Sequence, residues 1–382
     1  MASFPGSVGR KALALKSFLR AAAATAILLG AAGAAGAQPQ PKALEVKADA
    51  PFRHAHARLE LPPRVGGIAR SRVAELEPDQ LDTIVDYTAP DLSSAYTFYI
   101  YRNVAGALPV WFDRAAWMIE HRDALGTATR HGTAAAFVPP ARSEAAGLLA
   151  TYDLSGKDFR STGIALVPLG EWYVKLRASS KTLSAAELES AMKAALAELR
   201  WPKSMPPAAA AMPVERCATA LALRDEAKPI EGSERAGEST ILNAIMGIAV
   251  ANAAKKKGEP APVRTTIWCQ DAAQALQAGV YRADGATDSY LLALSDAGRA
   301  IWAGPDPGLS ILSQIDAKAK ADKPTFLVKL LLLPRTLTSR AYDRLPPPNQ
   351  ALAIVKEGHF ASAVPTWGAA KGHIELSADA LK

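Results

Sequence analysis

The sequence has only two cysteines, Cys217 and Cys269, among its 382 residues. Their wide separation excludes a C-x-x-C redox motif and a cysteine-based zinc knuckle. In an exported protein, two cysteines predict one structural disulfide; two free buried thiols are the alternative. Such a bridge would close a loop of about 50 residues and stabilise the fold by roughly 4 kcal/mol.

The short motifs that identify common catalytic sites are also missing. The sequence has no G-x-x-x-x-G-K-[ST] phosphate loop, no G-x-G-x-x-G after a strand, no G-x-S-x-G elbow and no H-E-x-x-H zinc motif. Ser190 and Lys193 form an S-x-x-K pattern, but it lies within a predicted helix and has no K-T-G or S-D-N companion. We therefore expect no cofactor and no catalytic residue that a motif can identify.

Metal-ligand patterns are weak as well. His54 and His56 form an H-x-H pair, but no third ligand lies nearby in the sequence, so a solvated segment is the simpler interpretation and we expect no metal site. Paired catalytic carboxylates remain open from sequence alone. One acidic cluster, which we interpret as solvated surface, comprises Glu75, Glu77, Asp79 and Asp82.

No long run of one charge sign occurs. Residues 1–37 contain four of the 44 basic residues and no acid, so the remaining 40 Lys and Arg face 37 Asp and Glu. This near balance argues against an electrostatic nucleic-acid binder, which usually carries a clear basic face. Because 49% of the residues are apolar, the chain can bury a core and is not of the disordered class.

The first 37 residues have the three parts of a secretory signal peptide. A basic start precedes the apolar run 21–34 (AAAATAILLGAAGA), and the small residues Ala35-Gly36-Ala37 form an A-x-A cleavage site. The basic residues are Arg10, Lys11, Lys16 and Arg20. We expect a cleaved signal peptide and a periplasmic protein without a membrane span. An uncleaved anchor is the alternative, although a span needs roughly 20 strongly apolar residues.

The remaining chain is long enough for about two domains. Residues 38–60 are polar with scattered prolines and predict a flexible lead-in. Residues 61–202 then form a first domain, and residues 203–213 (KSMPPAAAAMP) a Pro/Ala linker. Residues 214–382 form a second domain that holds both cysteines.

Alternating polar and apolar residues predict strands in the first domain, and two helices interrupt them. The helices run from Pro109 to about Ala124 and from Ser184 to about Leu199, where Ser184 and Glu187 form a capping box. This order predicts an α+β fold in which helices cover an antiparallel sheet. The predicted strands are Thr83–Thr88, Tyr96–Arg102, Ala134–Val138, Gly147–Leu154, Thr162–Pro168 and Glu171–Ser179.

The second domain predicts the same class of fold. Residues Thr240–Lys257 predict a helix that is apolar nearly all round from 241 to 251, typical of a buried core helix; a membrane- or partner-facing helix is the alternative. A short helix is expected at Gln350–Lys356. The predicted strands are Cys217–Leu223, Thr265–Cys269, Gly279–Arg282, Ser289–Leu294, Arg299–Ala303 and Phe326–Leu333.

Two aromatic strands are the most distinctive feature of the sequence. In GEWYVKLRAS (170–179), Trp172, Val174 and Leu176 share one face, whereas Tyr173, Lys175 and Arg177 share the other. A solvent-facing row of Tyr, Lys and Arg is a candidate surface for an anionic ligand or a partner protein. The alternative is an ordinary half-buried sheet face that a helix covers.

These segments also carry a resemblance. The run from LPPRVGG (61–67) through YTFYIYR (96–102) and GEWYVKLRAS (170–179) to Arg200-Trp201-Pro202 resembles exported alphaproteobacterial proteins of unknown function. The order of its elements is distantly similar to the PsbP-like sandwich, an antiparallel sheet covered by helices. The resemblance implies a binding or adaptor role and supplies no catalytic residue.

Together these observations favour a non-catalytic periplasmic protein that binds an envelope protein or a small-molecule ligand. An envelope enzyme of hydrolase type, with a site assembled from scattered residues, is the first alternative. A membrane-associated protein that exposes the helix at 241–251 is the second. We expect no nucleic-acid partner.

Overall fold

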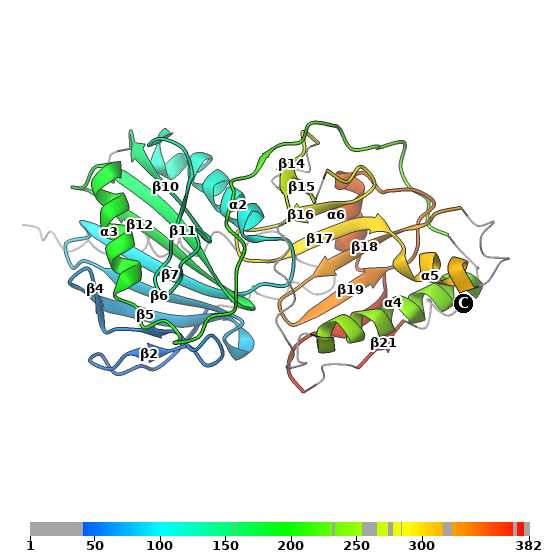
Figure 1. Ribbon diagram of the computed structural model, residues 1–382, viewed down its shortest axis with the longest axis horizontal. Helices are drawn as coiled ribbons and strands as arrows, with labels where there is room; N and C mark the ends of the chain where they lie inside the picture. The colour runs from blue at the N-terminus through cyan, green and yellow to red at the C-terminus, as the bar shows by residue number, and fades with distance from the viewer. Residues whose placement is uncertain are drawn as a thin grey trace, which may run out of the picture.

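The computed structural model describes residues 41–156, 158–230, 234–253, 266–273, 278–283, 285–315, 323–369 and 373–377. The predicted signal peptide, residues 1–37, lies outside the described residues. The described chain has an α+β fold that is rich in antiparallel sheet and built on two large sheets, which lie side by side in Figure 1. The predicted fold class is confirmed at this level.

The first sheet has the strand order β1-β5-β6-β7-β12-β11-β10-β8, with β4 and β9 paired to its flanks, and every pairing is antiparallel. Each strand predicted between 83 and 179 is present within two residues of its expected bounds. The strands are β1 (Lys42–Ala43), β4 (Arg64–Val65), β5 (Ile68–Glu77), β6 (Asp82–Thr88), β7 (Ser94–Arg102), β8 (Ala128–Arg130), β9 (Ala135–Phe137), β10 (Gly147–Leu154), β11 (Ser161–Leu169) and β12 (Trp172–Ser180).

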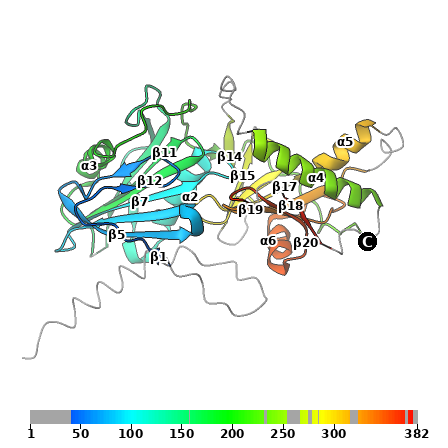
Figure 2. The same ribbon diagram turned by 90° about the horizontal axis from the view of Figure 1, so that it is seen from below.

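Two helices cover opposite faces of this sheet. Helix α3 (Ala185–Ala197) buries Leu188, Met192 and Leu196 in one core, and Figure 2 shows it along one side of the strands. Its capping box is confirmed, because the Ser184 side chain accepts a hydrogen bond from Glu187 N and Glu187 accepts one from Ser184 N. Helix α2 (Leu108–Glu120) packs on the other face within a second core.

The expected flexible lead-in at 38–60 is wrong for the described residues from 41 onward. Strands β2 (Phe52–Arg53) and β3 (Glu60–Leu61) form a hairpin, and Phe52, Leu59 and Leu61 are buried in the same core as α3. The prediction failed because it used the average composition of this segment, which is polar. A few large apolar side chains attach the segment to the sheet.

The second sheet has the order β13-β14-β15-β16-β17-β18-β19-β20-β21 and is antiparallel except for the β13–β14 pair. The strand predicted at Cys217–Leu223 is wrong, because strand pairing stops at Arg216. Strands β19 and β20 had not been predicted. The strands are β13 (Glu215–Arg216), β14 (Trp268–Gln270), β15 (Gly279–Ala283), β16 (Tyr290–Ala293), β17 (Ala300–Pro305), β18 (Phe326–Leu331), β19 (Arg335–Ser339), β20 (Phe360–Pro365) and β21 (Glu375–Leu376).

Helices lie on both sides of the second sheet, as Figure 2 shows. Helix α6 (Pro348–Glu357) buries its apolar side in the core of the sheet, whereas α5 (Pro307–Ile315) and α4 (Glu234–Ala253) pack together on the other side. The expected burial of α4 is only partly correct, because Ile241 and Ile245 are 40% and 51% exposed. No helix in the part of the chain that the structure describes is long and apolar enough to cross a membrane.

The two sheets share a core. One hydrophobic cluster contains Tyr101 and Trp111 from the first sheet and its helix together with Tyr281, Leu291 and Ala300 from the second sheet. Residues 203–213, the predicted linker, contain no helix or strand and lead from the first sheet to β13. The junction between the sheets is therefore packed rather than open, and it places α2 beside β14 and β15 (Figure 1).

Candidate functional site

The predicted ligand surface lies inside this junction. The alternation of β12 is confirmed, but Tyr173 and Lys175 are only 4% and 1% exposed, and Arg177 is half-buried. The expected solvent-facing row is therefore wrong for Tyr173 and Lys175. The face is covered because α2 packs on it and the turn between β16 and β17 inserts against it, neither of which the pattern of a single strand reveals.

Lys175 holds the two sheets together. Its Nζ lies 2.8 Å from Asp296 Oδ2 and donates to the Asp296 carbonyl oxygen at 3.0 Å, and it also sits 4.4 Å above the Tyr99 ring. Burial acts against the charged form of Asp296, but the charges of Lys175, Arg177 and Arg114 outweigh it and lower the pKa of this carboxyl. The Lys175 ammonium therefore forms a structural contact between the two sheets.

A second ion pair crosses the junction nearby. Arg299, next to the β16–β17 turn, contacts Asp82 at 3.1 Å and Glu77 at 2.9 Å. The acidic cluster interpreted as solvated surface therefore supplies part of the junction, because Asp82 is buried against the second sheet. These contacts fill the face of β12 around Lys175. Tyr173 instead lines a second pocket, of about 370 Å³, together with Leu108 and residues 208–213.

A pocket of about 470 Å³ opens elsewhere along the junction, between α2 and the β14–β15 end of the second sheet. We call it the junction pocket. Its walls are mostly polar, in contrast to the packed core beside it. The lining residues are Asp113, Arg114, Trp117, Glu120 and His121 on one wall, and Arg216, Gln270, Asp271, Ala272, Ala273, Ala278, Gly279 and Val280 on the other.

Helix geometry places the first wall. Asp113, Trp117 and Glu120 are four and then three residues apart, so they share one face of α2. The guanidinium of Arg114 lies 4.2 Å from the Trp117 ring centroid, and the His121 ring stacks on the same indole at 4.3 Å. This stack gives the pocket an aromatic edge.

The two carboxylates of α2 have different surroundings. Glu120 accepts hydrogen bonds from Arg130 at 2.5 Å and from the Tyr152 hydroxyl at 3.1 Å. Asp113 accepts one from the Tyr281 hydroxyl of the second sheet at 2.7 Å. Burial raises the pKa of the Asp113 carboxyl, because desolvation disfavours the charged form more than the Tyr281 hydrogen bond and the nearby charges of Arg130 and Arg114 favour it.

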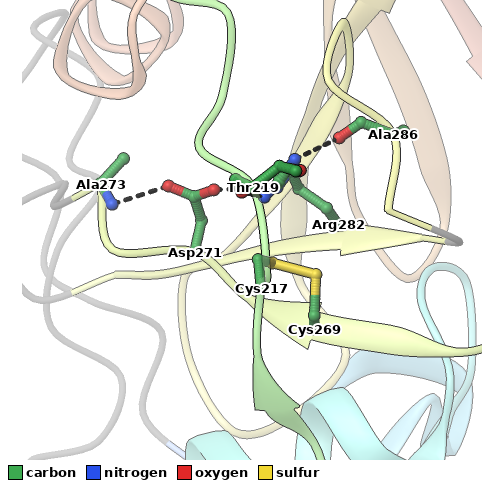
Figure 3. The surroundings of a disulfide bond; sticks show 7 residues. All are labelled: Cys217, Thr219, Cys269, Asp271, Ala273, Arg282 and Ala286. Carbon is green, nitrogen blue, oxygen red and sulfur yellow. Dashed lines mark hydrogen bonds and ion pairs between the residues drawn. A yellow bond between two sulfur atoms is a disulfide. The ribbon is translucent and has the colours of Figure 1, made fainter.

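The disulfide shapes the second wall, as Figure 3 shows. Cys217 and Cys269 are bonded, so the predicted bridge is confirmed, and Cys217 N donates to the Gln270 carbonyl at 3.0 Å. The pocket residues Arg216 and Gln270 are the direct neighbours of the two cysteines. The bridge therefore fixes the strand pair from which they project.

A buried ion pair lies behind this wall. Arg282 Nε is 2.8 Å from Asp271 Oδ2, and Arg282 also donates to the carbonyls of Ala286 and Thr219 (Figure 3). Asp271 in turn accepts from Ala273 N at 2.8 Å. These bonds tie the chain after each cysteine to β15, and they satisfy the charge of Asp271 from within the protein.

The H-x-H pair is a structural clasp and not a solvated segment. His54 is 3% exposed, its Nδ1 accepts from the backbone N–H groups of His56 and Ala57, and its Nε2 donates to the Gln80 carbonyl at 3.0 Å. Among the residues described, no group of three His, Cys, Asp or Glu side chains is placed to hold a metal ion.

The residues of the junction pocket had not been predicted. The only sequence signal for Asp113, Trp117 and Glu120 is a polar stripe on a helix, which usually marks a solvated face. These three residues form a pocket wall only because the second sheet lies opposite them. No local sequence pattern predicts where that sheet packs. Comparison with protein-family models, with curated proteins and with solved structures gave no match to this chain.

Proposed function

We propose that this is an exported, non-catalytic binding protein of the bacterial cell envelope, and that its ligand is a small polar molecule held in the junction pocket. The signal-like residues 1–37 support export, and the disulfide between Cys217 and Cys269 suits an oxidising compartment. We further propose that residues 61–202 and 214–382 are two domains, with the site between them.

The observation that carries the proposal is the pocket itself. Its volume of about 470 Å³ lies within the range of small-molecule sites, which occur preferentially between domains. Its two walls come from segments more than 90 residues apart, and a disulfide and a buried ion pair fix one of them. Such a preorganised polar concavity binds a ligand with little loss of conformational entropy.

A ligand screen by thermal unfolding tests the proposal. Residues 38–382 would be screened against small polar molecules, and a bound ligand should raise Tm progressively as its free concentration exceeds Kd. Substituting the exposed Ala272 with Trp should fill the pocket and abolish the shift, whereas Ala186→Trp, exposed on α3, should leave it unchanged. If no compound raises Tm, or if Ala272→Trp leaves the shift intact, the proposal is wrong.

One observation favours an enzyme as the second candidate. The raised pKa of Asp113 beside a pocket is typical of a carboxyl that acts as a general acid. Under this reading the protein would be a hydrolase-type enzyme of the envelope. Conversion of a screen ligand to product by the wild-type protein, and loss of that turnover in Asp113→Asn, would favour it over simple binding.

A further inference from the structure

The charges that line the junction pocket are unevenly compensated. The Asp271 carboxylate is paired with Arg282, which is completely buried, and Glu120 is paired with Arg130 and hydrogen-bonded to Tyr152. These two acids have little remaining capacity to bind a charged ligand, because the protein already satisfies them.

Asp113 differs from them. Its hydrogen-bond partner is the Tyr281 hydroxyl at 2.7 Å, and no ion pair of the described residues involves Asp113. A carboxylate that is half-buried and bonded to a neutral donor gains most from a cationic group in the pocket. An ammonium is a small cation that can donate hydrogen bonds to this carboxylate.

The opposite wall offers a cation. Arg216 is exposed, and no carboxylate within the described ranges lies within ion-pair distance of its guanidinium. Its backbone is held beside Gln270 by the β13–β14 pairing and by the disulfide at the next residue. The planar guanidinium can bind a carboxylate through two parallel hydrogen bonds.

We infer that the junction pocket binds a small zwitterion, a molecule with one ammonium and one carboxylate, such as an amino acid or a dipeptide. The ammonium contacts Asp113 on the α2 wall, and the carboxylate contacts Arg216 on the β13 wall. The inference rests on the proposed function and names the ligand class of that site. Opposite charges on opposite walls select a ligand with two charges over one with a single charge.

Calorimetric titration with three related probes tests this class. The probes are L-alanyl-L-alanine, its N-acetyl derivative and its C-terminal amide. Each modification removes one charge, and a charge-assisted hydrogen bond accounts for about tenfold or more in affinity. Wild-type residues 38–382 should therefore bind the unmodified dipeptide at least about tenfold more tightly than either derivative.

Two substitutions assign each charge to its wall. In Asp113→Asn, which keeps an acceptor for Tyr281, N-acetylation should no longer weaken binding, although amidation still should. In Arg216→Gln the reverse should hold. The matched control is Lys193→Gln, whose side chain is exposed on α3, lines neither wall and pairs with Glu189. Asp113→Glu, which retains the charge, should keep the preference for the free amine, and circular dichroism confirms that each variant folds.

The outcomes separate the two proposals. If another compound of the screen binds and Ala272→Trp blocks it, while the dipeptide does not bind or binds no better than its derivatives, the zwitterion class is wrong and the proposed function survives. If no compound binds at this site, both are wrong. If Asp113→Asn or Arg216→Gln alone abolished the preference for the free amine and also the preference for the free carboxylate, the assignment of one charge to each wall would be wrong.

Discussion

A buried imidazole illustrates how single residues hold this fold together. His54 binds the Gln80 carbonyl and the neighbouring His56 binds the Asp79 carbonyl, in a turn where these two non-glycine residues have positive φ values of 54° and 59°. The turn lies between Glu77 and Asp82, which pair with Arg299 of the second sheet. The clasp thus supports a strained turn beside the junction.

Acid should weaken this clasp. Burial lowers the pKa of His54 to about 4 from 6.5, and protonation would give Nδ1 a proton where it now accepts two N–H groups. As pH falls, the unfolded state therefore takes up this proton at a higher pH than the folded state does. The contribution of His54 to the free energy of unfolding is complete above pH 6.5 and declines as pH falls to 4. The loss amounts to about 3 kcal/mol.

Urea unfolding at pH 7.5 and pH 4 measures this loss. His54→Asn, which retains an acceptor but does not titrate near these values, should show a pH dependence smaller by about 3 kcal/mol than wild type. His131→Asn, at an exposed position, should match wild type. Equal pH dependence in wild type and His54→Asn would refute the role assigned to the imidazole.

Glycine 298 allows the β16–β17 turn to approach the first sheet. Its φ is +81°, and a Cβ there would lie 3.0 Å from the Arg102 carbonyl oxygen. Gly298→Ala should destabilise the protein by about 2 kcal/mol or more through backbone strain and this contact. Gly285→Ala is the matched control, since its φ is +69° with open space around it, and it should cost about 1 kcal/mol. Equal losses of unfolding free energy would show that the close approach is unimportant.

At the scale of elements, the disulfide has the clearest consequence. It joins residues 52 apart in sequence, and removing it with Cys217→Ser and Cys269→Ser should lower the free energy of unfolding by about 4 kcal/mol. The β13–β14 pair is only two residues long, so the variant should also lose ligand affinity through Arg216. Urea unfolding and calorimetry measure both effects, and unchanged affinity would show that the bridge does not position this wall.

The strands of the first sheet were predictable because their period is local. Tyr96, Phe98 and Ile100 alternate as expected and all enter one core. Strand β5 was missed because the apolar residues of its sequence, IARSRVAELE, stand mostly in adjacent pairs and do not alternate with polar ones. Its place in the sheet depends on pairing with β6. The burial of α4 was misjudged for a related reason. Its inner side is fixed by polar bonds from Ser239 and Asn243 to Asp306, and hydrophobicity does not report such bonds.

At the scale of the whole molecule, the sheet junction decides what is exposed. The sequence predicted which residues of β12 share a face, but not what covers that face, because the covering turn lies more than 100 residues away. Lys175 was therefore interpreted as surface, although it forms a buried ion pair. The junction pocket escaped prediction for the same reason, since it exists only where α2 meets β14 and β15.

The buried pair of Lys175 and Asp296 should couple the two sheets. Lys175→Met leaves the Asp296 carboxylate buried without its cation and should cost about 3–5 kcal/mol in unfolding free energy. Adding Asp296→Asn should recover part of this loss, because the uncompensated charge is removed. Lys193→Met, at an exposed pair on α3, should change stability by less than about 1 kcal/mol. If the double variant is no more stable than Lys175→Met, the ion pair between Lys175 and Asp296 does not couple the two sheets.

The central claim is that the junction pocket is the binding site of this protein. Hydrogen–deuterium exchange of residues 38–382, with and without the best ligand of the screen, tests it most directly. The account predicts added protection in two segments, 113–121 of α2 and 268–273 around β14, and unchanged exchange in α3. Protection confined to other segments, with no change at either of these two, would contradict it.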